Sequence, residues 1–571
     1  MLRNLPVVRS FGALILFLAT AVLTIYILLW SRHFGATFAA TRMAQPFVYL
    51  FTVFDAPAAA WGLVLVVAAA LVARKDSFRP LLGWIADHVW LIAGVACVAL
   101  CIGTRVFYFN HPLTQDECAP YFQSRIFSAG HLAGQLPPGL VDRLISPLYQ
   151  GEFYPVSHAT GRVAEAYWPG FALLMTPFTF LGLPWACNPV ISALTLPAIR
   201  RLAARIFGDR ETAGLAVLLT LASPVFLGDG ISFYSMAAHL LANCVFALLL
   251  LDPTPRRALA AGVVGSIALI LHNPVPHMLF AVPWMLAIAR RSDAARLTGC
   301  LVIGYLPLCL LLGMGWPVFT AGIAHEGMVA AHGTSSFDPT RFTGAFALPD
   351  STIWVARGIG IMKIWLWAVP GMVLLAFVGG WKWRHNPHCR TLAASALVTL
   401  VGYVLVPFDQ GHGWGYRYFH SAWMVLPLLA AGALARVPDG LRSSSNATPT
   451  LIERLTEDGG VRTYLVACAL LSLTLGWGLR ATQIREFVSG QMGRPGLPAY
   501  TGTEHRVVLM NSGVPLPWVD PWLRGDVIYL PSFGPKADAA VMHAYFPSLH
   551  QVFSDSQGTV WSAVPVPQSG T

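Results

Sequence analysis

Two adjacent carboxylates, Asp116 and Glu117, open a polar stretch that directly follows an apolar run. Neighbouring residues of a helix point about 100° apart, so the two acids cannot serve one task from one face. Asp116 could therefore point at the reacting centre, while Glu117 would hold a partner residue or an ion. The alternative is an acid pair that caps a helix lying along the membrane surface.

The residues after this acid pair have the pattern of an amphipathic helix. Pro120 suits the first helical turn, and Gly130 suits the end of the helix. Tyr121 and Arg125 fall together on the polar face of this helix. We expect both side chains to bind substrate.

A second group of candidate residues surrounds Arg417. This arginine stands in a short loop, 409–420, between two apolar runs and is flanked by His412, Tyr416 and Tyr418. A fixed guanidinium would stabilise an anion that forms at this place, and the flanking side chains would bind substrate. The alternative is an interfacial anchor within an aromatic belt.

Arg357 and Lys363 lie inside an otherwise apolar run. A charge at such a position costs about 2.5–3.5 kcal/mol on insertion scales, so each cation needs a partner. The phosphate of a lipid is one candidate partner. The alternatives are snorkelling of Arg357 to the membrane surface and a buried ion pair for Lys363.

The composition requires that these residues be positioned by membrane-spanning helices. Of 571 residues, 56% are hydrophobic and only 11% are charged, and the mean hydropathy is +0.60, which excludes a soluble globular, disordered or fibrous chain. The net charge of +10 comes from short clusters of Lys and Arg between apolar runs. Such clusters indicate membrane orientation rather than binding of nucleic acid.

Apolar runs of about 20 residues predict an all-α polytopic protein with about 13 transmembrane helices. The first run, from residue 11, exceeds the ~7–15 residue core of a signal peptide and is interpreted as a retained span. The positive clusters predict a cytoplasmic N-terminus and an outer loop at 105–165. Within residues 167–206 only one net crossing fits, so we expect a re-entrant or interfacial helix at 168–184.

Three regions are predicted. Residues 1–80 form an N-terminal transmembrane extension, and residues 81–480 form the main transmembrane module. Residues 481–571 alternate apolar runs with Pro and Gly turns and predict a small extracytoplasmic α/β domain. Its expected elements are strands at 507–510 and 527–530 and a helix at 537–545.

Several motifs accompany the acid pair. They are Gln123, Ala129-Gly130-His131-Leu132, Gly161-Arg162, Tyr167-Trp168-Pro169-Gly170, Phe207-Gly208, Ser223-Pro224, Tyr234-Ser235-Met236 and the segment from Gly413-Trp414-Gly415-Tyr416-Arg417-Tyr418 to Pro427. Together they resemble the GT-C glycosyltransferases, which include bacterial aminoarabinose transferases and protein mannosyltransferases. The resemblance covers about residues 85–480, and the two spans that precede the acidic loop's own span depart from the family pattern.

The resemblance implies a GT-C fold and an inverting transfer of one sugar from a polyprenyl-phosphate donor. Asp116 would act as the catalytic base, assisted by Glu117 and Asp229. Asp229 lies in the short loop 228–235, where a turn-stabilising role between two glycines is the alternative. Arg417, Arg357 and Lys363 would bind the donor phosphate.

The expected setting is the outer face of a bacterial inner membrane, with a glycan, a lipid or a protein as acceptor. No metal site is predicted, because the scattered histidines lack the spacing of metal ligands, although a divalent cation is a conceivable cofactor. The rival function is a polytopic transporter or lipid flippase. The absence of an evident inverted repeat weighs against it.

Overall fold

The computed structural model describes residues 10–37, 45–72, 78–326, 347–408, 411–437, 456, 459–492, 505–511 and 516–563. Its chain forms two compact units. Unit 1 comprises Met1–Phe107, Asn188–Leu310 and Asp338–Arg485, and unit 2 comprises Tyr108–Cys187, Leu311–Phe337 and Glu486–Thr571. The residues of the predicted N-terminal extension therefore belong to the same unit as most of the helical module.

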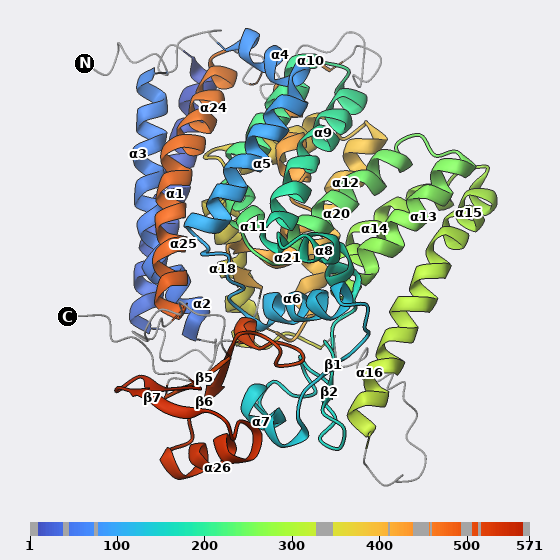
Figure 1. Ribbon diagram of the computed structural model, residues 1–571. Coiled ribbons are helices and arrows are strands. Elements are labelled where there is room, and N and C mark those ends of the chain that lie inside the picture. Colours follow the sequence, from blue (N-terminus) through green and yellow to red (C-terminus); the bar gives the residue numbers. More distant parts are fainter. Residues whose placement is uncertain are drawn as a thin grey trace. The chain divides into compact units, whose positions relative to one another are not determined.

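Unit 1 is helical, and in it the N-terminal helices of the chain pack against helices that begin at residue 459. Its first helices are α1 (Phe11–Thr37), α2 (Gln45–Tyr49), the π-helical η4 (Leu50–Asp55), α3 (Ala56–Val72), α4 (Arg79–Asp87) and α5 (Val89–Val106). Figure 1 shows α1 and α3 beside α24 (Gly459–Leu471), which continues through the π-helical η10 (Ser472–Gly476) into α25 (Trp477–Met492). The N-terminal helices are thus part of the unit's core.

The remaining helices of unit 1 lie between these two groups in sequence. They are α9 (Cys187–Phe207), α10 (Arg210–Ala222), α11 (Pro224–Ile231), α12 (Met236–Leu250), α13 (Pro255–Ile270), α14 (Val275–Ala289), α15 (Ala294–Leu308), α18 (Ser351–Leu366), α19 (Met372–Lys382), α20 (Pro387–Gly402), α21 (Arg417–His420) and α22 (Val425–Ala433). A two-residue hairpin, β3 (His412–Gly413) and β4 (Gly415–Tyr416), precedes α21.

The helices are those of a multi-pass membrane protein. Within the described residues, six are long and apolar enough to cross a membrane, or seven if α10 and α11, bent by 59°, form one span. The expected number of about 13 is not confirmed. Several expected spans, such as α12 and α14, are helices of only 15 residues, shorter than the ~20 residues that a perpendicular crossing needs.

The apolar run that contains Arg357 and Lys363 does not form one continuous helix. It begins in α18 and continues in α19, and the segment between them includes Gly371, whose φ of 85° is incompatible with an α-helix. Residues 167–206 form α8 (Gly170–Phe180) and α9. With eleven residues, α8 is about half as long as a span, which agrees with the expectation that one of these two stretches does not cross fully.

Unit 2 combines the predicted outer loop with the C-terminal region. Besides α8 it contains α6 (Gln115–Ser128), β1 (Gly134–Gln135), α7 (Val141–Leu144), β2 (Arg162–Val163), α16 (Gly315–His325), β5 (Arg506–Met510), β6 (Val527–Pro531), α26 (Pro535–Tyr545), β7 (His550–Ser554) and β8 (Gly558–Ser562). The predicted helix after the acid pair is confirmed, but it begins at Gln115. Pro120 therefore lies inside it rather than in its first turn.

The C-terminal strands form one mixed sheet in the order β6-β5-β8-β7. The strands β5 and β6 run parallel with Arg506 opposite Val527, whereas β8 pairs antiparallel with both β5 and β7. The two predicted strands and the predicted helix of this region are confirmed as β5, β6 and α26. Figure 1 shows the sheet and α26 in the colours of the chain's end.

One hydrophobic core joins the outer loop to this sheet. The loop contributes Phe122 and Ile126 of α6, and the sheet contributes Leu509 and Leu530. All four side chains are almost fully buried. Burying such side chains contributes about 1.5–3 kcal/mol each, so the outer loop and the C-terminal region stabilise each other.

A buried ion pair adds a directional link within unit 2. Arg143 of α7 lies 3.0 Å from Asp538 of α26 and also donates hydrogen bonds to the carbonyl groups of Pro531 and Ala537. Burial alone would raise the pKa of the Asp538 carboxyl. Hydrogen bonds from Ser532 and the Phe533 N–H, together with Arg143, outweigh burial and place this pKa below its usual range.

We expect Arg143→Ala to destabilise unit 2 by about 3 kcal/mol, because it leaves a carboxylate buried without its cation. Hydrogen exchange of peptides from β6 and α26, measured on the full-length protein, should accelerate. Since the pKa of Asp538 is lowered, the stabilisation is present at neutral pH and is lost as the pH falls below about 4.

The matched control is His158→Gln. His158 pairs with Asp142 in the same unit, but the two side chains are 58% and 62% exposed. An exposed pair contributes at most about 1 kcal/mol. Equal acceleration of exchange in both variants would contradict a special role for the Arg143 pair.

Candidate functional site

Asp116 lies in the first turn of α6, outside the long apolar helices. A capping box fixes this turn: the Thr114 side chain accepts from the Glu117 N–H, and the Glu117 carboxylate accepts from the Thr114 N–H. The Asp116 Oδ1 accepts a hydrogen bond of 2.5 Å from the Tyr167 hydroxyl. Asp116 itself is half-buried, so part of its surface remains accessible to a reactant.

Glu117 has a different environment from its neighbour. It is fully buried, and its carboxylate accepts hydrogen bonds from the Tyr108 hydroxyl at 2.8 Å and from the backbone N–H groups of Leu113 and Thr114. This is the geometry of the helix-capping alternative. A catalytic role of Glu117 stays a prediction, and any such role would be through the position of Asp116.

Tyr167 was part of a recognised motif but was not among the predicted site residues. Its ring packs edge-to-face on Phe153, with ring centroids 5.9 Å apart. The preceding residue of the loop, Ala166, donates its N–H to the Phe153 carbonyl. Both contacts hold the hydroxyl of Tyr167 toward the start of α6, where it meets Asp116.

Arg125, predicted to bind substrate, contacts the C-terminal region. Its guanidinium lies 2.8 Å from the Asp520 carboxylate and donates to the Val519 carbonyl. The same guanidinium lies 6.0 Å from the ring of Tyr121. Both residues therefore stand on α6 near the segment after the first C-terminal strand, and their substrate contacts remain predictions.

Glu165 is a buried acid that the sequence did not single out. Its side chain is fully buried, and neither carboxyl oxygen has a hydrogen-bond partner. Its backbone is fixed, because its N–H donates to Gln123 and its carbonyl accepts from Trp316. Burial raises the pKa of this carboxyl well above its usual range, which favours the neutral acid.

In unit 1, Arg417 is the first residue of α21 and directly follows the β3–β4 hairpin. Its side chain is buried, and its guanidinium lies 4.6 Å from the centroid of the Tyr234 ring. Gly415, with φ 87°, provides the hairpin's tight turn. The hairpin and α21 are thus folded inward, which differs from the exposed surface loop of the interfacial-anchor alternative.

Asp229 lies inside α11 and not in a loop, which corrects the prediction of a turn at 228–235. The adjacent glycines reflect close packing, since a Cβ on Gly228 would lie 2.7 Å from Trp414. Asp229 Oδ2 is 2.8 Å from Nδ1 of the buried His420. The contact is an ion pair when His420 is protonated.

Arg357 of α18 is buried and held by backbone carbonyls. Its guanidinium donates to the carbonyl oxygens of Tyr403, Val406 and Phe408 and lies 5.0 Å from the Tyr418 ring. These contacts stabilise the cation where α20 ends. A phosphate contact of Arg357 stays a prediction.

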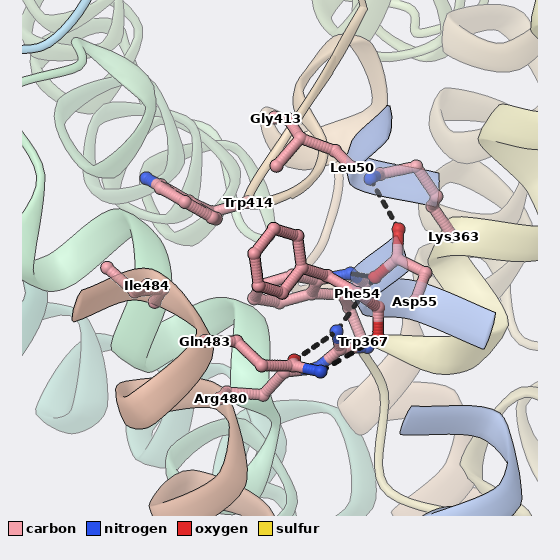
Figure 2. A pocket seen from close by; sticks show the side chains of 10 residues that line it. All are labelled: Leu50, Phe54, Asp55, Lys363, Trp367, Gly413, Trp414, Arg480, Gln483 and Ile484. Carbon is pink, nitrogen blue, oxygen red and sulfur yellow. Dashed lines mark hydrogen bonds and ion pairs between the residues drawn. The ribbon is translucent and has the colours of Figure 1, made fainter. Parts of the chain in front are cut away.

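Lys363, one and a half turns further along α18, pairs with a carboxylate. Its Nζ lies 2.6 Å from Asp55 Oδ2, and both side chains are 1% exposed. Figure 2 shows this pair beside Arg480, which contacts the other oxygen of Asp55. The buried ion pair was one of the two alternatives for Lys363, and its partner is supplied by the N-terminal helices.

The predicted aromatic surroundings of Arg417 are present. His412 and Tyr416 have ring centroids 5.7 Å apart, and Tyr418 stacks on Tyr403 at 4.3 Å. Unit 1 thus brings together His412, Tyr416, Arg417, Tyr418 and Arg357. Unit 2 brings together Asp116, Glu117, Tyr121 and Arg125 on α6.

Among the described residues, no three His, Cys, Asp or Glu side chains are arranged to hold a metal ion. The arrangement places reactive side chains in both units. In unit 2 it presents a carboxylate able to accept a proton, and in unit 1 it presents a buried guanidinium able to stabilise an anion.

We expect Tyr167→Phe to loosen Asp116 without unfolding unit 2. The Tyr167 hydroxyl donates a hydrogen bond to the Asp116 carboxylate, so its loss costs about 1 kcal/mol of local stability. Hydrogen exchange of the peptide at the start of α6, measured on the full-length protein, should accelerate accordingly. Tyr149→Phe, which removes a different hydroxyl of the same loop, should leave that exchange unchanged.

Glu165→Gln should be tolerated and should alter the dependence of stability on pH. Because the folded-state pKa of Glu165 is raised, the wild-type protein binds more protons folded than unfolded and loses stability as the pH rises above about 4.5. The glutamine variant should lose less stability between pH 5 and 8 when thermal unfolding is followed. An unchanged pH dependence, matching that of the exposed Glu152→Gln control, would contradict this assignment.

Comparison with known proteins gives a match at the level of the fold. No family model matches the sequence, and no curated protein does. Two solved structures of ArnT from Cupriavidus metallidurans match at 14% identity over 85% of this chain and 99% of ArnT. The TM-score is 0.48 for the apo structure and 0.50 for the one bound to undecaprenyl phosphate. The chain therefore shares the fold of the ArnT structure bound to undecaprenyl phosphate, which agrees with the fold expected from the motifs.

Proposed function

We propose that this protein is a membrane glycosyltransferase that moves a sugar from a polyprenyl-phosphate donor to an acceptor at the outer face of a bacterial inner membrane. The observation that carries the proposal is the half-exposed Asp116 carboxylate, fixed by Tyr167 at the start of α6, in a chain with a GT-C-like fold. The ArnT structure of comparable fold is bound to undecaprenyl phosphate, which supports a lipid carrier here as well.

The proposed reaction is a direct displacement at the sugar. The acceptor oxygen attacks the anomeric carbon and inverts it, while the bond from that carbon to the phosphate oxygen breaks. The proton of the acceptor hydroxyl passes to Asp116, and the polyprenyl phosphate leaves as an anion. Proton acceptance by a positioned carboxylate contributes about 10²–10⁴ to such a rate.

Arg417 is the proposed partner of the leaving phosphate. Its guanidinium is buried beside Tyr234 and His412 in a hairpin that is rich in aromatic side chains, where an ionic hydrogen bond is stronger than in water. A lipid donor suits this position, because a polyprenyl carrier diffuses within the membrane to a site built by apolar helices. Asp229, oriented by His420, would help to position donor or acceptor.

Asp116→Asn tests the proposal. The variant should insert normally and still bind undecaprenyl phosphate, whereas its sugar transfer should fall by about 10²–10⁴, the contribution of a general base. Mass spectrometry of envelope glycans and glycolipids from cells that lack the wild-type protein and produce the variant would measure this loss. The same spectra with and without the wild-type protein identify the sugar and the acceptor.

The control is Glu152→Gln, which removes an exposed acid from the same loop. It should restore transfer fully. Normal glycan profiles in the Asp116→Asn cells would remove Asp116 as the base. An unchanged envelope in cells lacking the protein altogether would favour a transporter or a non-catalytic subunit.

A further inference from the structure

A group of charged side chains lies in unit 1 outside the predicted site. It consists of Asp55, Lys363 and Arg480, here called the Asp55 cluster (Figure 2). Asp55 contacts Lys363 with one carboxylate oxygen at 2.6 Å and Arg480 with the other at 2.8 Å. Sequence reasoning did not identify Asp55 or Arg480, because each is a single charge within an apolar run.

Neutral groups complete the cluster. Trp367 donates its indole N–H to the same oxygen of Asp55 that Arg480 contacts. Gln483 accepts from Arg480 and donates to the carbonyl of Phe54. The carboxylate is therefore held in one position by donors from α18, from the segment just after α18 and from α25.

The charge of the Asp55 cluster is not balanced. Its three ionic side chains are 1–3% exposed. Among the residues that the structure describes, two cations share one carboxylate, which leaves a surplus of one positive charge. A net charge buried in a membrane protein is unfavourable unless it has a function or a further partner. Among the ten residues that line the adjoining small pocket, Asp55 is the only acid.

This surplus charge lies beside the loop that carries Arg417. Gly413 and Trp414 of the hairpin line the same pocket as Lys363 and Arg480 (Figure 2). Gly413 also packs against the side chain of Arg417, since a Cβ at this glycine would lie 3.2 Å from Arg417 Cδ. The Asp55 cluster and Arg417 therefore form one region of positive potential.

The N-terminal helices are built into this region. Phe34 and Phe51 pack in one core with Ile359 of α18, and the ring of Phe47 lies 5.8 Å from that of His412. Asp55 ends the π-helical η4, and Arg480 follows the π-helical η10 by four residues. Such wide turns redirect side chains within a helix and are frequent at functional sites.

We propose that Asp55 is a positioning residue that sets the net charge of the polyprenyl-phosphate site. It holds Lys363 and Arg480 together while leaving one positive charge of the cluster uncompensated beside Arg417. This inference rests on the proposed function and extends it: the N-terminal pair of helices, which departs from the family pattern, tunes the affinity for the phosphate. The phosphate itself contacts Arg417.

The test varies the charge of the cluster and measures binding of undecaprenyl phosphate to the purified full-length protein. The cluster carries +1 in the wild type, +2 in Asp55→Asn and 0 in Arg480→Gln. The double variant Asp55→Asn/Arg480→Gln again carries +1. If the cluster acts through its charge, affinity follows this order, with steps on the order of tenfold for a charge roughly 10 Å from the phosphate.

A merely structural role of Asp55 predicts a different pattern. Asp55→Asn would then weaken binding as Arg480→Gln does, and the double variant would be at least as weak as either; this pattern overturns the inference. If Asp55→Asn does not fold, the affinity of the double variant is compared with those of Arg480→Gln and Lys363→Met. In each of these two single variants the Asp55 cluster carries no net charge. Recovery of affinity in the double variant supports the inference, and no recovery contradicts it.

Two controls separate the charge effect from others. Arg291→Gln also removes one positive charge, but from a side chain 45% exposed, and should leave affinity unchanged. Undecaprenol, which has no phosphate, should not distinguish the variants. If the wild-type protein binds undecaprenyl phosphate no better than undecaprenol, the proposed function fails; if it binds and the variants do not follow their charge, only this inference fails.

Discussion

Two buried cations that share one carboxylate determine which helices of unit 1 must remain together. Asp55 comes from η4, Lys363 from α18 and Arg480 from α25, and these residues are separated by more than one hundred positions in the chain. Separating the helices would leave charges without partners in a medium that solvates them poorly, at a cost of several kcal/mol per ion. The Asp55 cluster therefore holds together helices from the beginning, the middle and the end of the helical region.

Three other buried charged groups also have polar partners. Arg357 donates to three backbone carbonyls, Glu117 accepts from three donors around the first turn of α6, and Arg143 pairs with Asp538 and donates to two carbonyls. Each of these groups stabilises a chain end or a joint between segments. Asp116 differs in being half-exposed while it is oriented by Tyr167, and this combination of order and access is what a reacting group needs.

Local patterns predicted local features well. The acidic start and the glycine end of α6, the strands β5 and β6 and the helix α26 each follow from residues close together in sequence. Features that depend on distant partners were missed. Asp229 lies in a helix instead of a turn, and Gly228 beside it packs closely against Trp414, a contact between residues far apart in sequence.

The number of spans and the partners of the charges were also not accessible from the sequence. Hydropathy counts apolar residues, but the break at Gly371 and the short helices α12 and α14 are decided by tertiary packing. Likewise, Lys363 and Arg480 each suggest an absent partner when they are considered alone. Only the fold reveals that a single aspartate from the first helices serves both.

The shared core of unit 2 affects how the protein folds during translation. Val163 closes the part of that core made by the loop, whereas Val507 begins the part made by the C-terminal strands. At about 5–20 residues per second, a ribosome needs roughly 20–70 s to synthesise the chain between them. During this interval Phe122 and Ile126 lack the contacts that the C-terminal strands supply. The core of unit 2 is therefore completed only when translation is almost finished, and chains that end early lack this part of the core.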